Sequence, residues 1–218
     1  MTTLAQPRVS GLLERLYARA ETNDAEVRAR NAPAVARLEG PWDDQVLAPL
    51  LEDSFMCIAP EVGRLLYLLV RSRRPELVVE FGTSFGISAI HLAAALRDNG
   101  AGRLITTEQS SAKAERAAAH IREAGLEDWV EIRRGDAFTT LAGVDGIDLL
   151  FLDGWKKLYL PLLQQLEPHL KPGCLVAADD VTSMAAQLAP YLEYVRQPAN
   201  GYVSCEVTMD DGLELSCR

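Results

Sequence analysis

The chain has 218 residues, of which 48% are hydrophobic and 24% charged, a composition typical of a globular protein and not of a disordered one. The net charge of −9 argues against a nucleic-acid partner or an anionic membrane surface, because no basic stripe offsets the acidic groups. Residues 1–20 lack the apolar core of a signal peptide, and the longest apolar run, residues 65–70, is too short to span a membrane.

The first part of the chain is predicted to be helical. Residues 8–39 have an amphipathic helical pattern, which ends at the sequence EGPWDD at 39–44. A second helical patch follows, and after it an apolar helix is predicted over 62–72. The stretch RARNAPAVAR at 28–37 is interpreted as a solvated helical segment without chemistry. We expect residues 1–55 to form an N-terminal extension.

From Pro75 onward strands alternate with helices, which predicts a parallel sheet with helices on both faces. A closing hairpin over 201–217 adds an antiparallel edge. The prediction is one doubly wound α/β domain over 1–218, with its core at 56–218. The strands are expected at 76–82, 102–108, 129–137, 147–154 and 173–180, and the intervening helices at 88–100, 111–125 and 159–170.

Ligands of such sheets lie outside the carboxyl ends of the strands, and the first strand here is followed by the glycine-containing turn EFGTSFG. This turn fails the dinucleotide fingerprint, because Ser84 and Ile87 occupy its second and third glycine positions. The helix start therefore lacks a pyrophosphate cradle, which favours a nucleoside without phosphates such as S-adenosylmethionine. Glu108 ends the second strand, and its carboxylate suits the two hydroxyls of a ribose.

Six stretches between residues 56 and 181 resemble, in order and spacing, the catechol and caffeoyl-CoA O-methyltransferases, which are class I enzymes that use S-adenosylmethionine. They are MCIAPEVG, LVVEFGTSFGISAIHLA, LITTEQ, GDA, FLDGWKKLYLP and VAADDV. The most specific is DGWKKLY, in which Gly154 stands where the catechol enzymes have His. The resemblance implies a mostly parallel seven-stranded Rossmann-like methyltransferase fold.

The resemblance also implies the roles of individual residues. Lys156 would be the catalytic base, and Trp155 would pack on the adenine. The implied metal ligands are Asp153, Asp179 and Asp180. The implied cofactor contacts are Ile58, Glu80, Gly82, Gly86, Ser88, Glu108, Asp136, Ala137, Asp153 and Trp155.

Elementary electrostatics agrees with a metal site. Two carboxylates about 4 Å apart repel by about 4 kcal/mol at an effective dielectric of about 20, so a clustered trio favours a cation. Oxygen-only ligands suit Mg²⁺ or another divalent cation. The family usually has Asp-Asn where this chain has Asp179-Asp180, and Asp180 adds a negative charge. A nearby cation is expected to lower the pKa of Lys156 so that it can accept a proton.

The predicted function is metal-dependent methyl transfer from S-adenosylmethionine to a hydroxyl of a small aromatic diol such as a catechol. The alternatives are a metal-independent methyltransferase, which could act on nitrogen, and a cofactor-binding protein without activity. A dinucleotide oxidoreductase is disfavoured by the failed fingerprint. The acceptor's walls are expected from the N-terminal helices, the GPWDD region and residues 182–202. Scattered cysteines without a Cys-x-x-Cys pair indicate a cytoplasmic protein, and the amphipathic extension would suit a homodimer.

Overall fold

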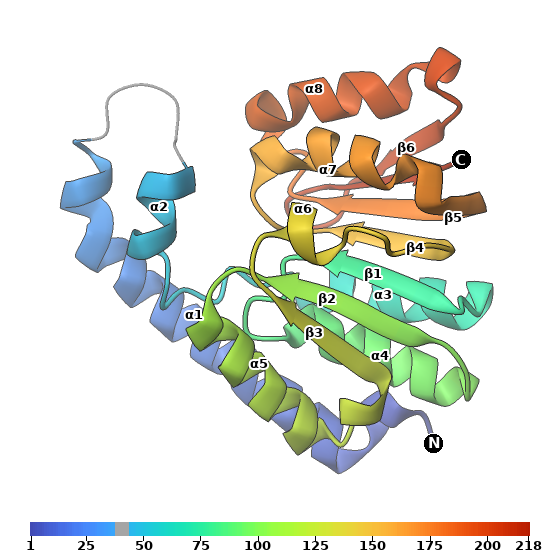
Figure 1. Ribbon diagram of the computed structural model, residues 1–218. Helices are drawn as coiled ribbons and strands as arrows, with labels where there is room; N and C mark the ends of the chain where they lie inside the picture. Colours follow the sequence, from blue (N-terminus) through green and yellow to red (C-terminus); the bar gives the residue numbers. More distant parts are fainter. Residues whose placement is uncertain (38–43) are drawn as a thin grey trace.

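The computed structural model describes residues 1–37 and 44–218. A seven-stranded sheet with the order β3-β2-β1-β4-β5-β7-β6 forms its centre (Figure 1). The first five strands are parallel, and β7 runs antiparallel to both of its neighbours. This arrangement confirms the predicted fold. The strands are β1 (Leu77–Phe81), β2 (Arg103–Glu108), β3 (Val130–Arg134), β4 (Ile147–Leu152), β5 (Leu170–Asp179), β6 (Val203–Val207) and β7 (Leu213–Cys217).

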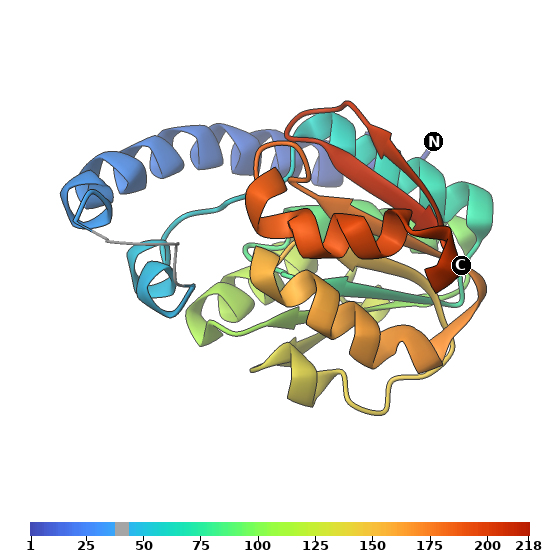
Figure 2. The same ribbon diagram turned by 90° about the horizontal axis from the view of Figure 1, so that it is seen from above.

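Helices cover both faces of the sheet (Figure 2). One apolar core joins the sheet to α1, α3, α4 and α5, and a second joins the opposite face to α6, α7 and α8. The helices are α1 (Pro7–Val35), α2 (Asp44–Leu50), α3 (Pro60–Arg73), α4 (Ile87–Asn99), α5 (Ser111–Ala124), α6 (Ala137–Thr140), α7 (Tyr159–Leu166) and α8 (Ala185–Arg196).

The central strands are apolar because helices bury both of their faces. Every residue of β1 is buried, as are five of the six residues of β4. The third strand is shorter than predicted. It ends at Arg134 because the side chain of Asp136 accepts a hydrogen bond from the N–H of Phe138 at 3.4 Å and so caps α6. The fifth strand begins earlier than predicted, at Leu170.

Helix α1 lies along α5, and its C-terminal part and α2 stand beside the carboxyl edge of the sheet (Figure 1). The guanidinium of Arg8 holds the contact with α5 by donating to the carbonyl oxygens of Arg122 and Glu123 at 2.7 and 2.5 Å. Within residues 1–37 and 44–218, no helix combines the length and apolarity that a bilayer crossing requires.

Candidate active site

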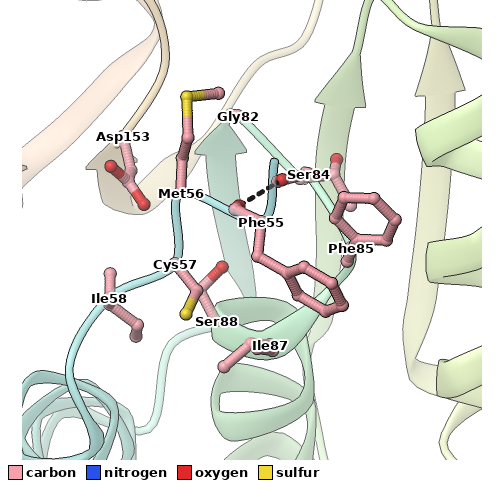
Figure 3. A pocket seen from close by; sticks show the side chains of 11 residues that line it. Phe55, Met56, Cys57, Ile58, Gly82, Ser84, Phe85, Ile87, Ser88 and Asp153 are labelled. Atoms are coloured by element: carbon pink, nitrogen blue, oxygen red, sulfur yellow. Dashed lines mark hydrogen bonds between the residues drawn. The ribbon is translucent and has the colours of Figure 1, made fainter. Parts of the chain in front are cut away.

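A pocket lies at the carboxyl edge of the sheet (Figure 3). Three segments form it. They are residues 55–58 before α3, which we call the pocket wall, the turn between β1 and α4 together with the first two residues of α4, and the residue that follows β4. Its lining residues are Phe55, Met56, Cys57, Ile58, Gly82, Thr83, Ser84, Phe85, Ile87, Ser88 and Asp153. Four residues of the predicted cofactor set are therefore in this lining, namely Ile58, Gly82, Ser88 and Asp153.

Close backbone packing explains the glycine at position 82. Its φ is +103°, and a Cβ there would lie 2.4 Å from the carbonyl oxygen of Asp153. The N–H of Asp153 also donates to the carbonyl oxygen of Phe81 at 2.8 Å, which fixes the chain after β4 against the chain after β1. Gly154 is constrained by a side chain instead, since a Cβ would lie 2.4 Å from the ring of Phe81. The Phe81 ring thus occupies space that any larger residue at position 154 would need.

Glu108 is held in place by two backbone donors. Its carboxylate accepts hydrogen bonds from the N–H groups of Ser84 and Ser110, each at 2.8 Å. Burial raises the pKa of this carboxyl, and the two bonds act in the opposite direction. Because each carboxylate oxygen can accept more than one hydrogen bond, this fixed group retains the capacity to bind two ribose hydroxyls.

Glu80 is a buried carboxyl with incomplete hydrogen bonding. Its side chain has no exposed area, Oε2 accepts from the hydroxyl of Thr106 at 2.5 Å, and Oε1 has no hydrogen-bond partner among the described residues. Burial raises the pKa of Glu80 to about 7, although the neighbouring hydroxyls of Ser88 and Thr106 lower it. An unpaired buried oxygen beside the pocket is suited to a cationic ligand group.

Replacing Glu80 by Gln should stabilise the protein more at about pH 8 than at about pH 5. The pKa of Glu80 is raised in the folded state, so its contribution to stability is present at low pH and lost as the pH rises through about 7. Gln is neutral at both pH values, so the variant does not undergo this loss of stability, which amounts to about 2 kcal/mol. Thermal unfolding of both proteins without cofactor measures the difference. An equal difference at the two pH values would contradict the placement of this carboxyl.

The other predicted cofactor residues are not part of the pocket's lining. Gly86 precedes α4 with φ +87°, Asp136 is exposed and caps α6, and Ala137 is buried as the first residue of α6. Trp155 is half-buried and precedes the 3-10 turn at Lys156–Leu158. The GPWDD region lies mostly outside the described residues.

The structure brings the three predicted metal ligands together. One carboxylate oxygen each of Asp153, Asp179 and Asp180 lies within 4.8 Å of the other two. Asp179 is 3% exposed, and within residues 1–37 and 44–218 its Oδ1 has no hydrogen-bond partner. Burial, followed by repulsion from Asp180, raises the pKa of Asp179. A cluster of carboxylate oxygens that includes the buried, incompletely bonded Asp179 fits a divalent cation.

Lys156 contacts this carboxylate cluster directly. Its Nζ lies 2.6 Å from Oδ2 of Asp180 and 3.4 Å from Oδ1 of Asp153, and it donates to the hydroxyl of Tyr159 at 2.8 Å. Although burial lowers the pKa of Lys156, the charges of Tyr159, Asp153 and Asp180 raise it well above its usual value. The expectation of a lowered pKa therefore does not hold for the protein groups by themselves.

Sequence reasoning missed Tyr159, which is fully buried and accepts a hydrogen bond from Lys156. Its ring packs edge-on against Phe81 with a centroid separation of 6.3 Å, and its hydroxyl donates to the carbonyl oxygen of Asp179 at 3.4 Å. Tyr159 lies three residues after Lys156 in the sequence, and this spacing predicts a contact between the two side chains only if the conformation of the intervening turn is known.

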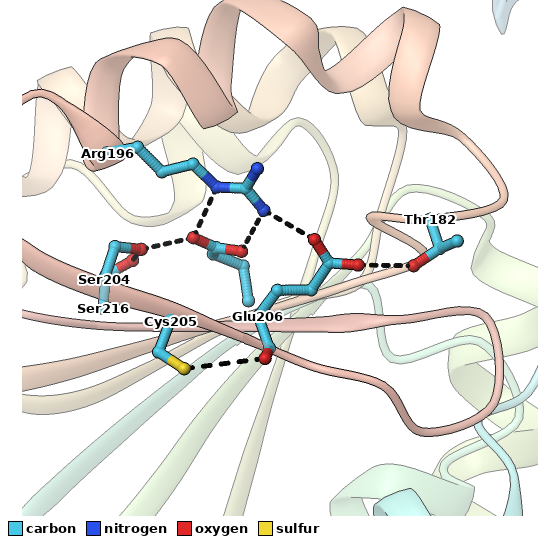
Figure 4. Close-up of polar contacts among 7 residues, drawn as sticks. Thr182, Arg196, Ser204, Cys205, Glu206 and Ser216 are labelled. Atoms are coloured by element: carbon cyan, nitrogen blue, oxygen red, sulfur yellow. Dashed lines mark hydrogen bonds and ion pairs between the residues drawn. The ribbon is translucent and has the colours of Figure 1, made fainter.

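A polar network around the buried Glu214 supports the chain just after Asp180 (Figure 4). Glu214 has no exposed area and accepts two bonds from the guanidinium of Arg196, at 2.6 and 2.9 Å. Arg196 also pairs with Glu206 at 2.9 Å, and Glu206 accepts from the hydroxyl of Thr182 at 2.8 Å. Because this buried carboxylate is fully paired, we interpret the network as structural. It ties α8 and the β6–β7 hairpin to the residues after β5.

The chain is similar in sequence to known methyltransferases. Residues 79–181 match a family model described as a methyltransferase domain. The catechol O-methyltransferase B of Danio rerio is 35% identical over 176 residues, which cover 74% of this chain and 65% of that protein. The catechol O-methyltransferase of Niastella koreensis is 34% identical over 157 residues, which cover 67% of this chain and 70% of that protein.

A solved structure shows the same fold. The O-methyltransferase of Bacillus cereus, in complex with SAH, superposes with a TM-score of 0.68 at 23% identity. The match covers 91% of this chain and 99% of that one.

Proposed function

Because this chain belongs to the S-adenosylmethionine-dependent O-methyltransferase family that includes the catechol and caffeoyl-CoA enzymes, we propose that it methylates a hydroxyl of a small vicinal diol, such as a catechol, in a metal-dependent reaction. The observation that carries the proposal is the convergence of three carboxylates and Lys156 on the edge of the pocket. This arrangement provides the groups that an acidic hydroxyl acceptor requires, next to the site proposed for the methyl donor.

The pocket is proposed to hold S-adenosylmethionine. Glu108 would accept hydrogen bonds from the ribose hydroxyls, and the unpaired oxygen of Glu80 would attract the cationic end of the cofactor. Gly82 and Gly86 would allow the ligand to approach the backbone, while Ile58 and Ser88 line the pocket. Trp155 is proposed to pack on the adenine, and Asp136 and Ala137 to contact the cofactor, as the family resemblance implies.

Asp153, Asp179 and Asp180 would hold a divalent cation such as Mg²⁺. When bound, the cation would acidify an acceptor hydroxyl and offset the negative charge of the three carboxylates. The chain's own contribution is a set of converging oxygens, two of which belong to carboxyls, Asp153 and Asp179, whose pKa is raised by loss of solvent. The additional charge of Asp180, compared with the family's usual Asn, is expected to strengthen the attraction for a cation.

Lys156 is proposed to act as the general base. Its Nζ would accept the proton of the acceptor hydroxyl, the hydroxyl oxygen would attack the methyl carbon, and the bond from that carbon to sulfur would break. The products would be the methyl ether and S-adenosylhomocysteine. Tyr159 and the carboxylates fix the position of the amine, so much of the acceleration would come from orientation.

A panel of catechols assayed for methyl transfer, with and without Mg²⁺, tests the proposal. Methylated product that depends on added Mg²⁺ would support it. Transfer that survives EDTA would favour the metal-independent methyltransferase, and cofactor binding without any transfer would favour a protein that no longer catalyses.

Glu108→Ala should weaken S-adenosylmethionine binding by about 1–3 kcal/mol, the usual cost of losing a charge-assisted hydrogen bond. Isothermal titration calorimetry measures the change. Glu115→Ala is a suitable control, because that carboxylate on α5 is exposed and pairs only with Arg134 in the contacts described. Unchanged affinity in Glu108→Ala would contradict the ribose assignment.

Three further predictions accompany the proposed activity and come from the sequence. They are residence in the cytoplasm, assembly as a homodimer, and organisation as one domain with an N-terminal extension over residues 1–55.

A further inference from the structure

The pocket wall, residues 55–58, is held by a carboxylate on helix α1. The N–H of Phe55 donates to Oδ1 of Asp24 at 2.7 Å, and the N–H of Met56 donates to Oδ2 at 2.9 Å. Met56 has a φ of +43°, in the left-handed region that is costly for a residue with a side chain. A single carboxylate therefore satisfies two consecutive amides at the point where the wall backbone is strained.

The opposite side of the wall is fixed to the turn after β1. The ring of Phe55 stacks on that of Phe85 with centroids 4.2 Å apart, and the hydroxyl of Ser84 donates to the carbonyl oxygen of Phe55 at 2.6 Å (Figure 3). The N–H of Ser84 in turn donates to Glu108. A continuous series of contacts thus runs from Asp24 through the wall to the carboxylate proposed to bind the ribose.

Other side chains of α1 hold the segment just before the wall. Asn23 donates to the carbonyl oxygen of Asp53 at 2.6 Å, Asn31 donates to that of Leu50 at 2.5 Å, and Arg30 pairs with the Asp53 carboxylate at 3.1 Å. Asn31 and Arg30 lie in the stretch interpreted from sequence as solvated, so the polar face of α1 has a partner in this chain. Among these contacts only those of Asp24 reach the wall itself.

We propose that Asp24 is a positioning residue for the cofactor pocket: its carboxylate keeps the strained Phe55–Met56 backbone in the conformation that S-adenosylmethionine requires. The inference rests on the proposed function of the pocket as a cofactor site. It gives the N-terminal helix a role in cofactor affinity, because the wall has the conformation that binds the cofactor only while its two amides remain paired. Phe55 and Ser84 retain their other contacts, so loss of Asp24 frees the wall without removing a ligand contact.

Asp24→Ala should raise the dissociation constant of S-adenosylhomocysteine by about five- to fifty-fold. The apparent constant rises because only the fraction of molecules that keep the wall in place can bind the ligand. The KM for S-adenosylmethionine should rise similarly while kcat at saturating cofactor is retained, since excess cofactor selects the competent wall. A merely structural role would not produce this separation. Asp24→Asn keeps one acceptor oxygen and should give an intermediate effect, which provides a second variant if the alanine protein folds poorly.

Arg30→Ala is the matched control, because it removes an exposed contact between α1 and the segment before the wall but leaves both wall amides paired. It should bind S-adenosylhomocysteine like the unmodified protein. Hydrogen exchange without ligand provides an independent measurement: the amides of Phe55 and Met56 should exchange faster in Asp24→Ala and not in Arg30→Ala.

The possible failures are distinguishable. Absence of S-adenosylhomocysteine binding by the unmodified protein would contradict the proposed function. Unchanged affinity of Asp24→Ala, beside a binding unmodified protein, would contradict the positioning role even if the two amides exchange faster. Unchanged exchange at Phe55 and Met56 would show that Asp24 does not hold the wall.

Discussion

Alanine at position 153 should lower divalent-cation-dependent methyl transfer by at least about 10²-fold, more than removal of an outer-shell partner of a metal site usually costs. Asp153 supplies one of three carboxylates that converge within 4.8 Å. Two carboxylates would remain, and the cation would lose both charge and a ligand oxygen. Product formation at saturating Mg²⁺, compared with the unmodified protein, measures the loss.

Cofactor binding should survive this substitution. Asp153 contacts the turn after β1 through its backbone: its N–H donates to the carbonyl oxygen of Phe81, and its carbonyl oxygen packs on Gly82. An alanine at this position keeps both backbone contacts. Asp145→Ala is the matched control, because that carboxylate is 79% exposed and pairs with His169. If chelation and Asp153→Ala both leave the rate unchanged, the metal site assignment is wrong.

The convergence of the carboxylates was predictable because strand register determines it. Leu152 of β4 pairs with Ala178 of β5 in a parallel ladder, so the residues that follow, Asp153 and Asp179, are neighbours at the same edge of the sheet. Apolar segments alternating with helices identify the two strands, and the carboxyl ends of parallel strands lie at one edge. The sequence pattern therefore predicts that these carboxylates lie at one edge of the sheet, whereas their role as metal ligands comes from the family resemblance.

The role of α1 was not predictable in the same way. Asp24 and Phe55 are far apart in the sequence, and their contact depends on how a surface helix crosses the carboxyl edge of the sheet. Periodicity identifies the buried face of α1, but polar residues on the other face look solvated whether or not another segment covers them. The left-handed backbone at Met56 and Asp180 carries no sequence signal either, since neither residue is Gly.

The protonation state of Lys156 also required the structure. From sequence, a nearby cation is expected to lower its pKa, whereas the described contacts with Asp180, Asp153 and Tyr159 raise the pKa. The two expectations differ because the first includes the charge of a bound cation and the second includes only the groups of the protein. The balance depends on whether the carboxylates are offset by a cation, and their number and distances are properties of the folded chain.

Replacing Lys156 by Ala should lower kcat by about 10²–10⁴, the usual effect of losing a positioned general base, with little change in cofactor affinity. Its Nζ lies at the carboxylate cluster, where an acceptor hydroxyl is proposed to bind, and the residue is outside the cofactor pocket's lining. Lys157→Ala, at the exposed neighbouring lysine, is the matched control and should retain near-normal turnover.

Arginine at position 156 distinguishes a base from an electrostatic clamp. A guanidinium stays protonated throughout the accessible pH range, so Lys156→Arg should fail as well if Nζ must accept a proton. Because the amine must first lose its own proton, single-turnover methyl transfer by the unmodified protein should increase between about pH 6 and about pH 10, and the residual rates of both variants should lack this dependence. If Lys156→Arg transfers the methyl group as fast as the unmodified protein, the cationic charge at this position is sufficient and the general-base assignment is wrong.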